Sequence, residues 1–182
     1  MKIVNHKRCL PHALAALLLI AGGATDAFAQ TSTVNVTGNI TGECRITGGA
    51  TLTIPLGDVA ASSFSGGDSF SPTAGMQNIT LACTANPGIT MTMTGVAYPS
   101  TASVLQLTNA GSAGVATGVG VQLLYDTSAT GTPTALLLRD TPVTIPTGST
   151  VTVRIGARYN ARVANPGAGV ANTTATLTFR VN

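Results

Sequence analysis

The chain has no tryptophan, and only 4% of its residues are aromatic and 8% are charged. Its two histidines (His6 and His12) and its two lysines (Lys2 and Lys7) all lie within the first twelve residues. The rest of the chain therefore cannot build a Ser-His-Asp triad or a zinc site with histidine ligands. It also has no glycine-rich phosphate loop between a predicted strand and a helix. We expect neither an enzyme nor a protein that carries a cofactor.

The first 29 residues have the composition of an export signal. Three basic residues precede the apolar run 13–21, which is too short to span a bilayer. Residues 27–29 read Ala-Phe-Ala, a pattern typical of signal cleavage sites. We predict a signal peptide at 1–29 and an exported chain of 153 residues (182 minus 29), long enough for one domain with a core.

Cleavage would leave a nearly neutral chain with two cysteines. Six arginines face five acids, a net charge of +1, and no basic patch indicates a nucleic-acid partner. The remaining cysteines are Cys44 and Cys83, and an even number in an exported chain favours one disulfide. A closed loop of about 40 residues would stabilise the fold by roughly 4 kcal/mol in the chain-entropy model. The alternative is a pair of free buried thiols.

Apolar and polar residues alternate with period two in most of the exported chain, which predicts half-buried β-strands. Stretches rich in Gly, Ser, Thr, Asn and Pro separate them, and the segment 108–118 is expected to be a loop. This pattern predicts an all-β sandwich. The last stretch has no successor in the sequence, so we expect it to pair with another chain. The alternating stretches are 34–40, 52–54, 79–83, 89–93, 119–125, 151–159 and 175–182.

Three of these regions have a familiar sequence when they are taken together. They are 32–44 (STVNVTGNITGEC), 118–126 (GVGVQLLYD) and the tail 157–182, which ends in ATLTFRVN. With the cysteine spacing and the export signal, the chain resembles the type 1 fimbrial family, the subunits of bacterial chaperone–usher pili. The resemblance implies that 42–182 form an incomplete immunoglobulin-like sandwich. A donor strand from a neighbouring subunit would complete it, after a periplasmic chaperone has first filled the groove.

The resemblance gives residues 30–41 the role of the N-terminal donor-strand arm. Val34, Val36 and Ile40 would enter a neighbour's groove, and Gly38 stands where the family places a small residue. Burial of three aliphatic side chains offers on the order of 5–8 kcal/mol before the costs of association. The alternative is an ordinary first strand packed within its own domain.

The same resemblance gives the other end of the chain a role in chaperone binding and in accepting the donor strand. Leu177, Phe179 and Val181 would line the groove, and chaperone basic residues would hold the Asn182 carboxylate. Val181 stands where the family has an aromatic residue. Gly169, fourteenth from the end, matches a recognition glycine of the family, although a glycine in this position is also typical of a turn.

These expectations favour a structural subunit of a fimbrium that polymerises by donor-strand exchange and supports cell adhesion. Its partners would be a periplasmic pilus chaperone, an outer-membrane usher, copies of itself or related pilus subunits, and a host receptor reached through the fibre. The chain would pass through the periplasm to the bacterial cell surface. The alternatives are a receptor-binding adhesin at the pilus tip, a secreted β-sandwich enzyme, and a monomer whose arm fills its own groove.

Overall fold

The computed structural model describes residues 35, 37, 41–99, 101–128, 130–133 and 135–182. Contacts within the chain divide it into Met1–Gly38 and Asn39–Asn182, and the fold below is that of the second unit. The predicted signal peptide and the predicted donor residues Val34, Val36, Gly38 and Ile40 lie outside the described residues. Within the described part, no helix has both the length and the apolar character needed to cross a membrane.

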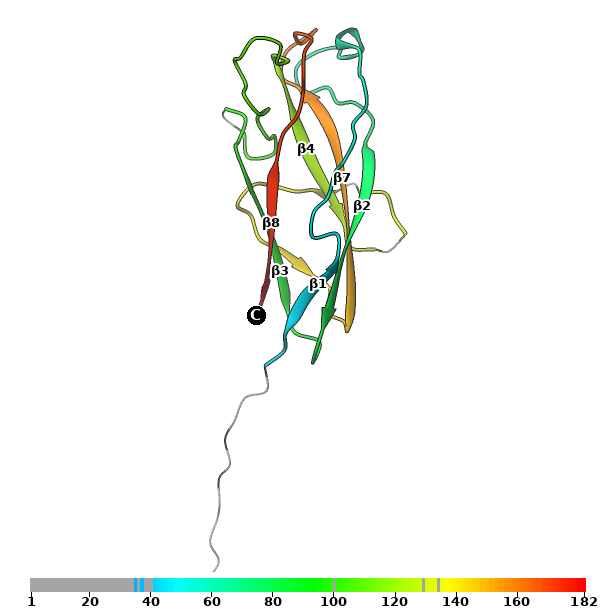
Figure 1. Cartoon of the computed structure of the whole chain (residues 1–182), viewed down its shortest axis with the longest axis vertical. Helices are drawn as coiled ribbons and strands as arrows, with labels where there is room; N and C mark the ends of the chain where they lie inside the picture. The colour runs from blue at the N-terminus through cyan, green and yellow to red at the C-terminus, as the bar shows by residue number, and fades with distance from the viewer. Residues whose placement is uncertain (1–34, 36, 38–40, 100, 129, 134) are drawn as a thin grey trace, which may run out of the picture. The chain divides into compact units, whose positions relative to one another are not determined.

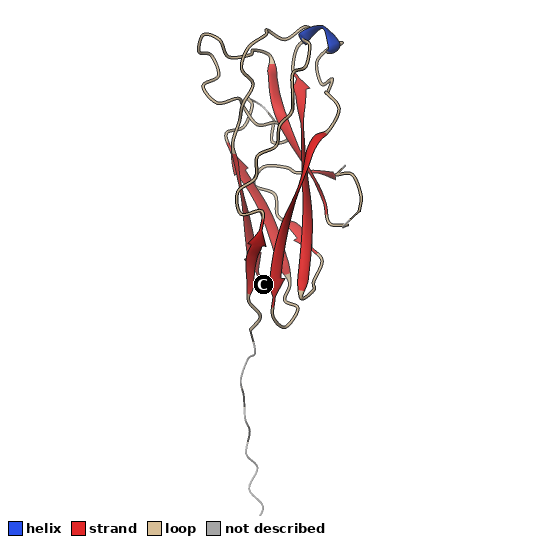
Figure 2. Cartoon of the chain, turned by 45° about the vertical axis from the view of Figure 1, so that its right-hand side comes forward, coloured by secondary structure: helices blue, strands red, loops and turns tan. Residues whose placement is uncertain are grey.

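Eight strands of the described residues form two antiparallel sheets (Figures 1 and 2). The larger sheet has the order β1-β2-β7-β4-β5, and the smaller sheet has the order β6-β3-β8. The one helical segment among the described residues is a 3-10 turn, η1 (Ala61–Ser63). The strands are β1 (Cys44–Gly48), β2 (Ala74–Cys83), β3 (Ile89–Gly95), β4 (Val119–Asp126), β5 (Ala135–Leu136), β6 (Val143–Ile145), β7 (Thr150–Ala161) and β8 (Ala175–Val181).

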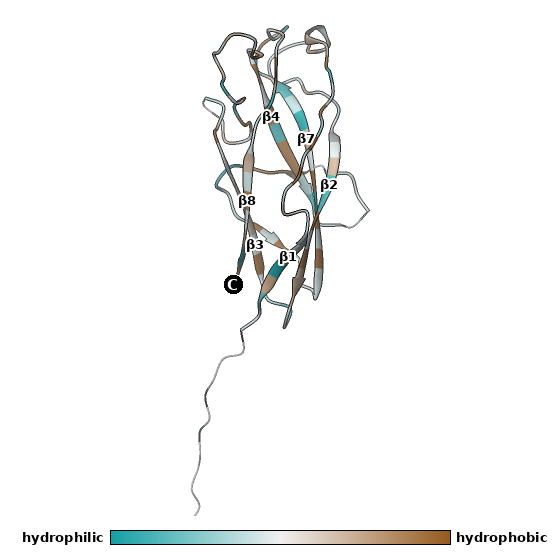
Figure 3. Cartoon of the chain, viewed as in Figure 1, coloured by the Kyte–Doolittle hydropathy of each residue, from teal (hydrophilic) through white to brown (hydrophobic). Residues whose placement is uncertain are grey.

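The two sheets pack face to face, and their buried apolar residues form two core clusters, which confirms the predicted all-β sandwich. Apolar residues alternate with polar ones along β3 and β8 (Figure 3), so these strands turn one face inward. β7 lies between β2 and β4 in the larger sheet, and its Val153 is fully buried. From the smaller sheet, Met91 and Met93 of β3 enter the same core and are also fully buried.

Of the predicted strands that lie within the described residues, all but the one at 52–54 form, and the stretch 34–40 lies largely outside those residues. The alternating stretches at 79–83, 89–93, 119–125, 151–159 and 175–182 correspond to β2, β3, β4, β7 and β8. Residues 52–54 do not join a sheet, although their side chains alternate between half-buried and exposed as a strand's would. The sequence pattern did not predict the short strands β1, β5 and β6, which have two to five residues each. Alternation over so few residues does not reliably indicate a strand, as residues 52–54 also show.

The disulfide predicted between Cys44 and Cys83 is confirmed. The two cysteines lie directly opposite each other in the antiparallel pair β1–β2. β1 is an edge strand of only five residues, and its three central side chains are exposed. The covalent bond therefore attaches a weakly buried edge strand to the larger sheet.

Replacing both cysteines with alanine should lower the free energy of unfolding by about 3–4 kcal/mol. The closed loop spans 39 residues of sequence separation, and its loss releases entropy to the unfolded chain. Urea unfolding of the wild type and of the Cys44→Ala/Cys83→Ala variant would measure the difference. A reductant should destabilise the wild type and leave the double variant unchanged. Equal stability of the oxidised wild type and the variant would contradict the prediction.

Candidate functional site: an open groove beside the last strand

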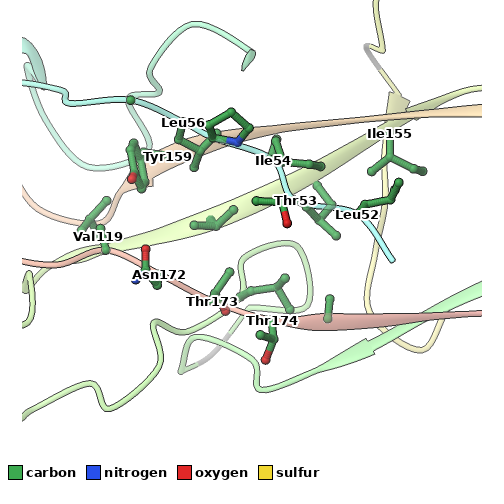
Figure 4. Close-up of a pocket in the computed structure, with 18 of the residues that line it drawn as sticks. Leu52, Thr53, Ile54, Leu56, Val119, Ile155, Tyr159, Asn172, Thr173 and Thr174 are labelled. Carbon is green, nitrogen blue, oxygen red and sulfur yellow. The ribbon is translucent and has the colours of Figure 1, made fainter. Parts of the chain in front are cut away.

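A long groove of about 1300 Å³ opens between two segments that are far apart in the sequence (Figure 4). We call residues 166–179, which include the first part of β8, the C-terminal wall. Residues 49–59, between β1 and η1, are the N-terminal wall. The inward faces of β4 and β7 supply most of the floor.

The C-terminal wall contains a strand edge without a partner. Within the described residues β8 pairs with β3 alone, so its other edge faces away from the sheet with unpaired N–H and C=O groups. Met91 and Met93 lie opposite Phe179 and Leu177 in the ladder. The two methionines are 0% exposed, whereas Leu177 and Phe179 are only half-buried. An apolar face beside a free edge is therefore left partly uncovered.

The N-terminal wall offers a second unpaired backbone. Leu52, Ile54 and Leu56 are half-buried while the residues between them are exposed, which is the alternation of an extended strand. In the described part of the chain, the backbone of residues 51–59 forms no hydrogen bond to another backbone group. The missing ladder explains why the predicted strand at 52–54 does not form. The groove is thus bordered on both sides by extended backbone with free hydrogen-bonding groups.

The floor of the groove is apolar, with one polar position at its edge. Val119, Val121 and Leu123 of β4 lie beside Ile155, Ala157 and Tyr159 of β7. Tyr159 is half-buried, and the loss of solvent around its hydroxyl raises its pKa. The negative charge of Asp58, in the N-terminal wall, raises the same pKa further. The groove therefore suits an aliphatic occupant along most of its length.

The first part of the C-terminal wall is fixed to the loop that precedes β4. The backbone N–H of Ala116 donates to the carbonyl of Val170 at 3.0 Å, and the N–H of Val170 donates to the carbonyl of Gly114 at 2.8 Å. A Cβ atom at Gly169 would lie 2.6 Å from the backbone nitrogen of Ala116. Only glycine fits this close approach of two backbones, so the wall's position depends on it.

Comparison of the sequence with known protein families identifies the family of this chain. The family described as Fimbrial protein matches residues 30–182, which is most of the chain. The chain belongs to the fimbrial protein family. This confirms the resemblance seen in the sequence, and it is a family of structural proteins of surface pili rather than of enzymes. A comparison with curated proteins found no matching sequence.

Solved structures similar to this fimbrial chain come from pili. The CupB6 tip adhesin from Pseudomonas aeruginosa aligns with a TM-score of 0.58 and 22% identity over 76% of this chain, which spans 38% of the adhesin. The P pilus rod subunit PapA aligns with a TM-score of 0.55 and 14% identity, over 76% of this chain and 99% of PapA. The Burkholderia pseudomallei antigen and type I fimbria protein aligns with a TM-score of 0.51 and 28% identity, over 78% of this chain and 94% of the Burkholderia chain. All three share the sandwich fold.

The structure brings some of the predicted site residues together and leaves others apart. Leu177, Phe179 and Gly169 line the groove. Val181 continues the same face of β8, opposite Ile89, but it is 40% exposed and lies beyond the lining residues. The backbone N–H of Asn182 donates to the carbonyl of Gly88 at 2.9 Å, which attaches the end of the chain to the start of β3.

Sequence reasoning missed the N-terminal wall as part of the site. The alternation at Leu52 and Ile54 is a usable signal, but by itself it predicts one more strand of the sandwich. Tyr159 and Asp58 were also missed. Tyr159 belongs to the regular inward pattern of β7, so nothing in the sequence distinguishes it from a core residue.

Gly169→Ala should lower the free energy of unfolding by about 1–3 kcal/mol, because the added methyl group collides with backbone atoms of the 114–116 loop. Gly66→Ala is the matched control, since nothing lies within 4 Å of its Cβ position. Chemical unfolding of the two variants would measure the difference. If Gly169→Ala were as stable as Gly66→Ala, the glycine would have no packing role and a recognition role would account for it better.

Tyr159→Phe should reduce the rate at which the free energy of unfolding falls as the pH rises above about 10. The tyrosine begins to lose its proton near its ordinary pKa of about 10 in the unfolded chain, but only at higher pH in the folded one. The unfolded state then binds fewer protons, so the free energy of unfolding falls as the pH rises. Urea unfolding at a series of pH values from about 9 to 11 would measure this slope. Asp58→Asn should reduce it partly, and an identical slope in Tyr159→Phe and wild type would exclude the proposed cause.

Proposed function

We propose that this fimbrial subunit polymerises by donor-strand exchange, with the groove as the acceptor site. The observation that supports this proposal is that, within the described residues, both walls have backbone N–H and C=O groups without partners. These groups belong to the outer edge of β8 in one wall and to residues 51–56 in the other. An inserted strand could form backbone hydrogen bonds with both walls while its apolar side chains cover the half-buried residues below. The inserted strand would complete the immunoglobulin-like sandwich.

The proposed donor is the arm 30–41 of another subunit. Val34, Val36 and Ile40 alternate with polar residues, so all three can face the floor while the arm's backbone pairs with the walls. Gly38 falls within the same alternating set and is the position at which the arm has no side chain. The aliphatic character of the arm matches that of the floor and of Leu52, Ile54 and Leu56.

The periplasmic chaperone is proposed to occupy the same groove before assembly. Leu177, Phe179 and Val181 would pair with a chaperone strand, and the Asn182 carboxylate would contact its basic side chains. Asn182 is exposed, so its carboxylate can be reached by another protein. The proposed role of Gly169 in recognition would be additional to its packing role.

The proposed route to the surface uses the signal peptide 1–29, the periplasm and an outer-membrane usher. The family match supports the domain boundary, because it begins at Gln30, the first residue after the predicted cleavage site. A receptor-binding role at the tip is compatible with the same fold. The likeness to the tip adhesin supports it less than the structural role, because this chain spans 38% of that protein.

The decisive experiment is an assembly assay with purified chaperone complexes of the chain with and without residues 30–41. The armless chain should accept the arm of a full-length subunit in its groove, but it has no arm to donate. Mixtures of the two should therefore end in short oligomers. Armless chains alone should stay unassembled. Native gels or size-exclusion chromatography would measure the products. Oligomers formed by armless chains alone would disprove the donor role of the arm.

Phe179→Asp should abolish both chaperone capture and strand acceptance, because it places a charge on the apolar wall. Thr178→Asp is the matched control, since Thr178 is exposed and faces the opposite side of β8. Co-purification with the chaperone and the assembly assay above would measure both steps. Equal capture of the two variants would remove β8 from the proposed acceptor site.

A further inference from the structure

One methionine of the described chain is accessible to solvent, and two are not. Met76 of β2 is 44% exposed, whereas Met91 and Met93 of β3 are both 0% exposed. A thioether reacts with an oxidant only where the oxidant can reach the sulfur. The three side chains therefore differ in access although they have the same chemistry.

Met76 lies at an irregularity in β2, on the same outward face as the exposed Asn78. The register with β7 shifts between Ala74 and Gln77, so the strand contains a bulge. Within it, Gly75 has a positive φ of 63°, and a Cβ atom there would collide with the side chain of Ile54 in the N-terminal wall. Glycine is thus required at the bulge. The residue after it, Met76, is displayed on the surface beside β7.

The sulfur of Met76 is in contact with the guanidinium group of Arg154, which has few hydrogen-bond acceptors around it. Arg154 Nη2 is 3.4 Å from Met76 Sδ, and Arg154 Nη1 donates to the carbonyl oxygen of Gly131 at 2.5 Å. Its Nε is buried and has no hydrogen-bond partner among the described atoms. Asp126 stands opposite Arg154 in the ladder, but its carboxylate accepts from the backbone and hydroxyl of Ser128 instead. A thioether is a weak acceptor, so Arg154 could use a stronger one at this position.

We propose that Met76 is an oxidation site whose sulfoxide is held by Arg154, so that the folded domain takes up one oxygen atom without unfolding. With hydrogen peroxide as the oxidant, the sulfur attacks one peroxide oxygen and the O–O bond breaks. An S=O bond forms, the proton on the transferred oxygen passes to the departing hydroxide, which leaves as water, and the sulfur loses the two electrons that the peroxide gains. The new oxygen is a strong acceptor adjacent to Arg154 Nη2.

The buried methionines give the opposite outcome. Met91 and Met93 belong to the core cluster between the two sheets. A sulfoxide there would place a polar oxygen among apolar side chains with no donor to satisfy it. Their oxidation therefore requires prior opening of the core, whereas that of Met76 does not.

Exposure of the purified chain to dilute hydrogen peroxide, followed by peptide mass spectrometry, tests the proposal. In the folded protein Met76 should oxidise at least about tenfold faster than Met91 and Met93. In guanidinium all three should oxidise at similar rates. Met76→Leu should gain no oxygen in the folded domain under the same treatment. Oxidation of Met91 or Met93 as fast as Met76 in the folded protein would overturn the site.

The role of Arg154 is tested by comparing thermal midpoints before and after Met76 is oxidised. In the wild type the midpoint should shift by less than about 2 °C, since the sulfoxide oxygen gains a donor. In Arg154→Gln oxidation should lower the midpoint by more than in the wild type. Equal shifts in the two proteins would remove Arg154 from the proposal. Unfolding of the wild type on oxidation of Met76 alone would refute tolerance of the sulfoxide.

Discussion

The free edge of β8 is the constraint on which the rest of this structure depends. An edge strand has one row of N–H and C=O groups without partners, and β8 has a neighbour on one side only among the described residues. The consequence reaches across the domain. Leu177 and Phe179 stay half-exposed, the groove between the two walls stays open, and the extended segment opposite remains outside the sheet. A fold of this kind suits the proposed association, because a strand inserted from another chain would pair with β8 and cover the groove.

The two walls are positioned by contacts that do not involve the occupant of the groove. The disulfide between Cys44 and Cys83 attaches β1, and with it the start of the N-terminal wall, to β2. Backbone hydrogen bonds between Val170 and the 114–116 loop fix the beginning of the C-terminal wall. The groove is therefore built by the described domain itself. An acceptor that is formed in advance loses less entropy on binding than one that must be ordered by its ligand.

Prediction from the sequence succeeded where the pattern is long and local. The alternation in β7 extends over twelve residues, and in β8 the alternation alone is enough to put Leu177 and Phe179 on one face. It failed at Leu52 and Ile54, where the same alternation marks an extended segment without a ladder. Side-chain periodicity reports which face is buried, but it does not report whether the backbone has a neighbour. Periodicity also does not show the packing requirement for glycine at position 169, because that requirement comes from a loop more than fifty residues away in sequence.

The sequence alone determined the class of fold, the disulfide, the resemblance to fimbrial subunits and the apolar face of the last strand. Each of these is carried by local composition or by spacing along the chain. Only the tertiary structure decided which segments and side chains lie together. It places the N-terminal wall along the groove and Tyr159 within reach of the charge of Asp58. On the sheet surface it places Met76 beside Arg154. The pair Met76 and Arg154 is brought together by the register of β2 with β7 and by the bulge in β2. A shift of one residue in either would turn the side chains to the other face.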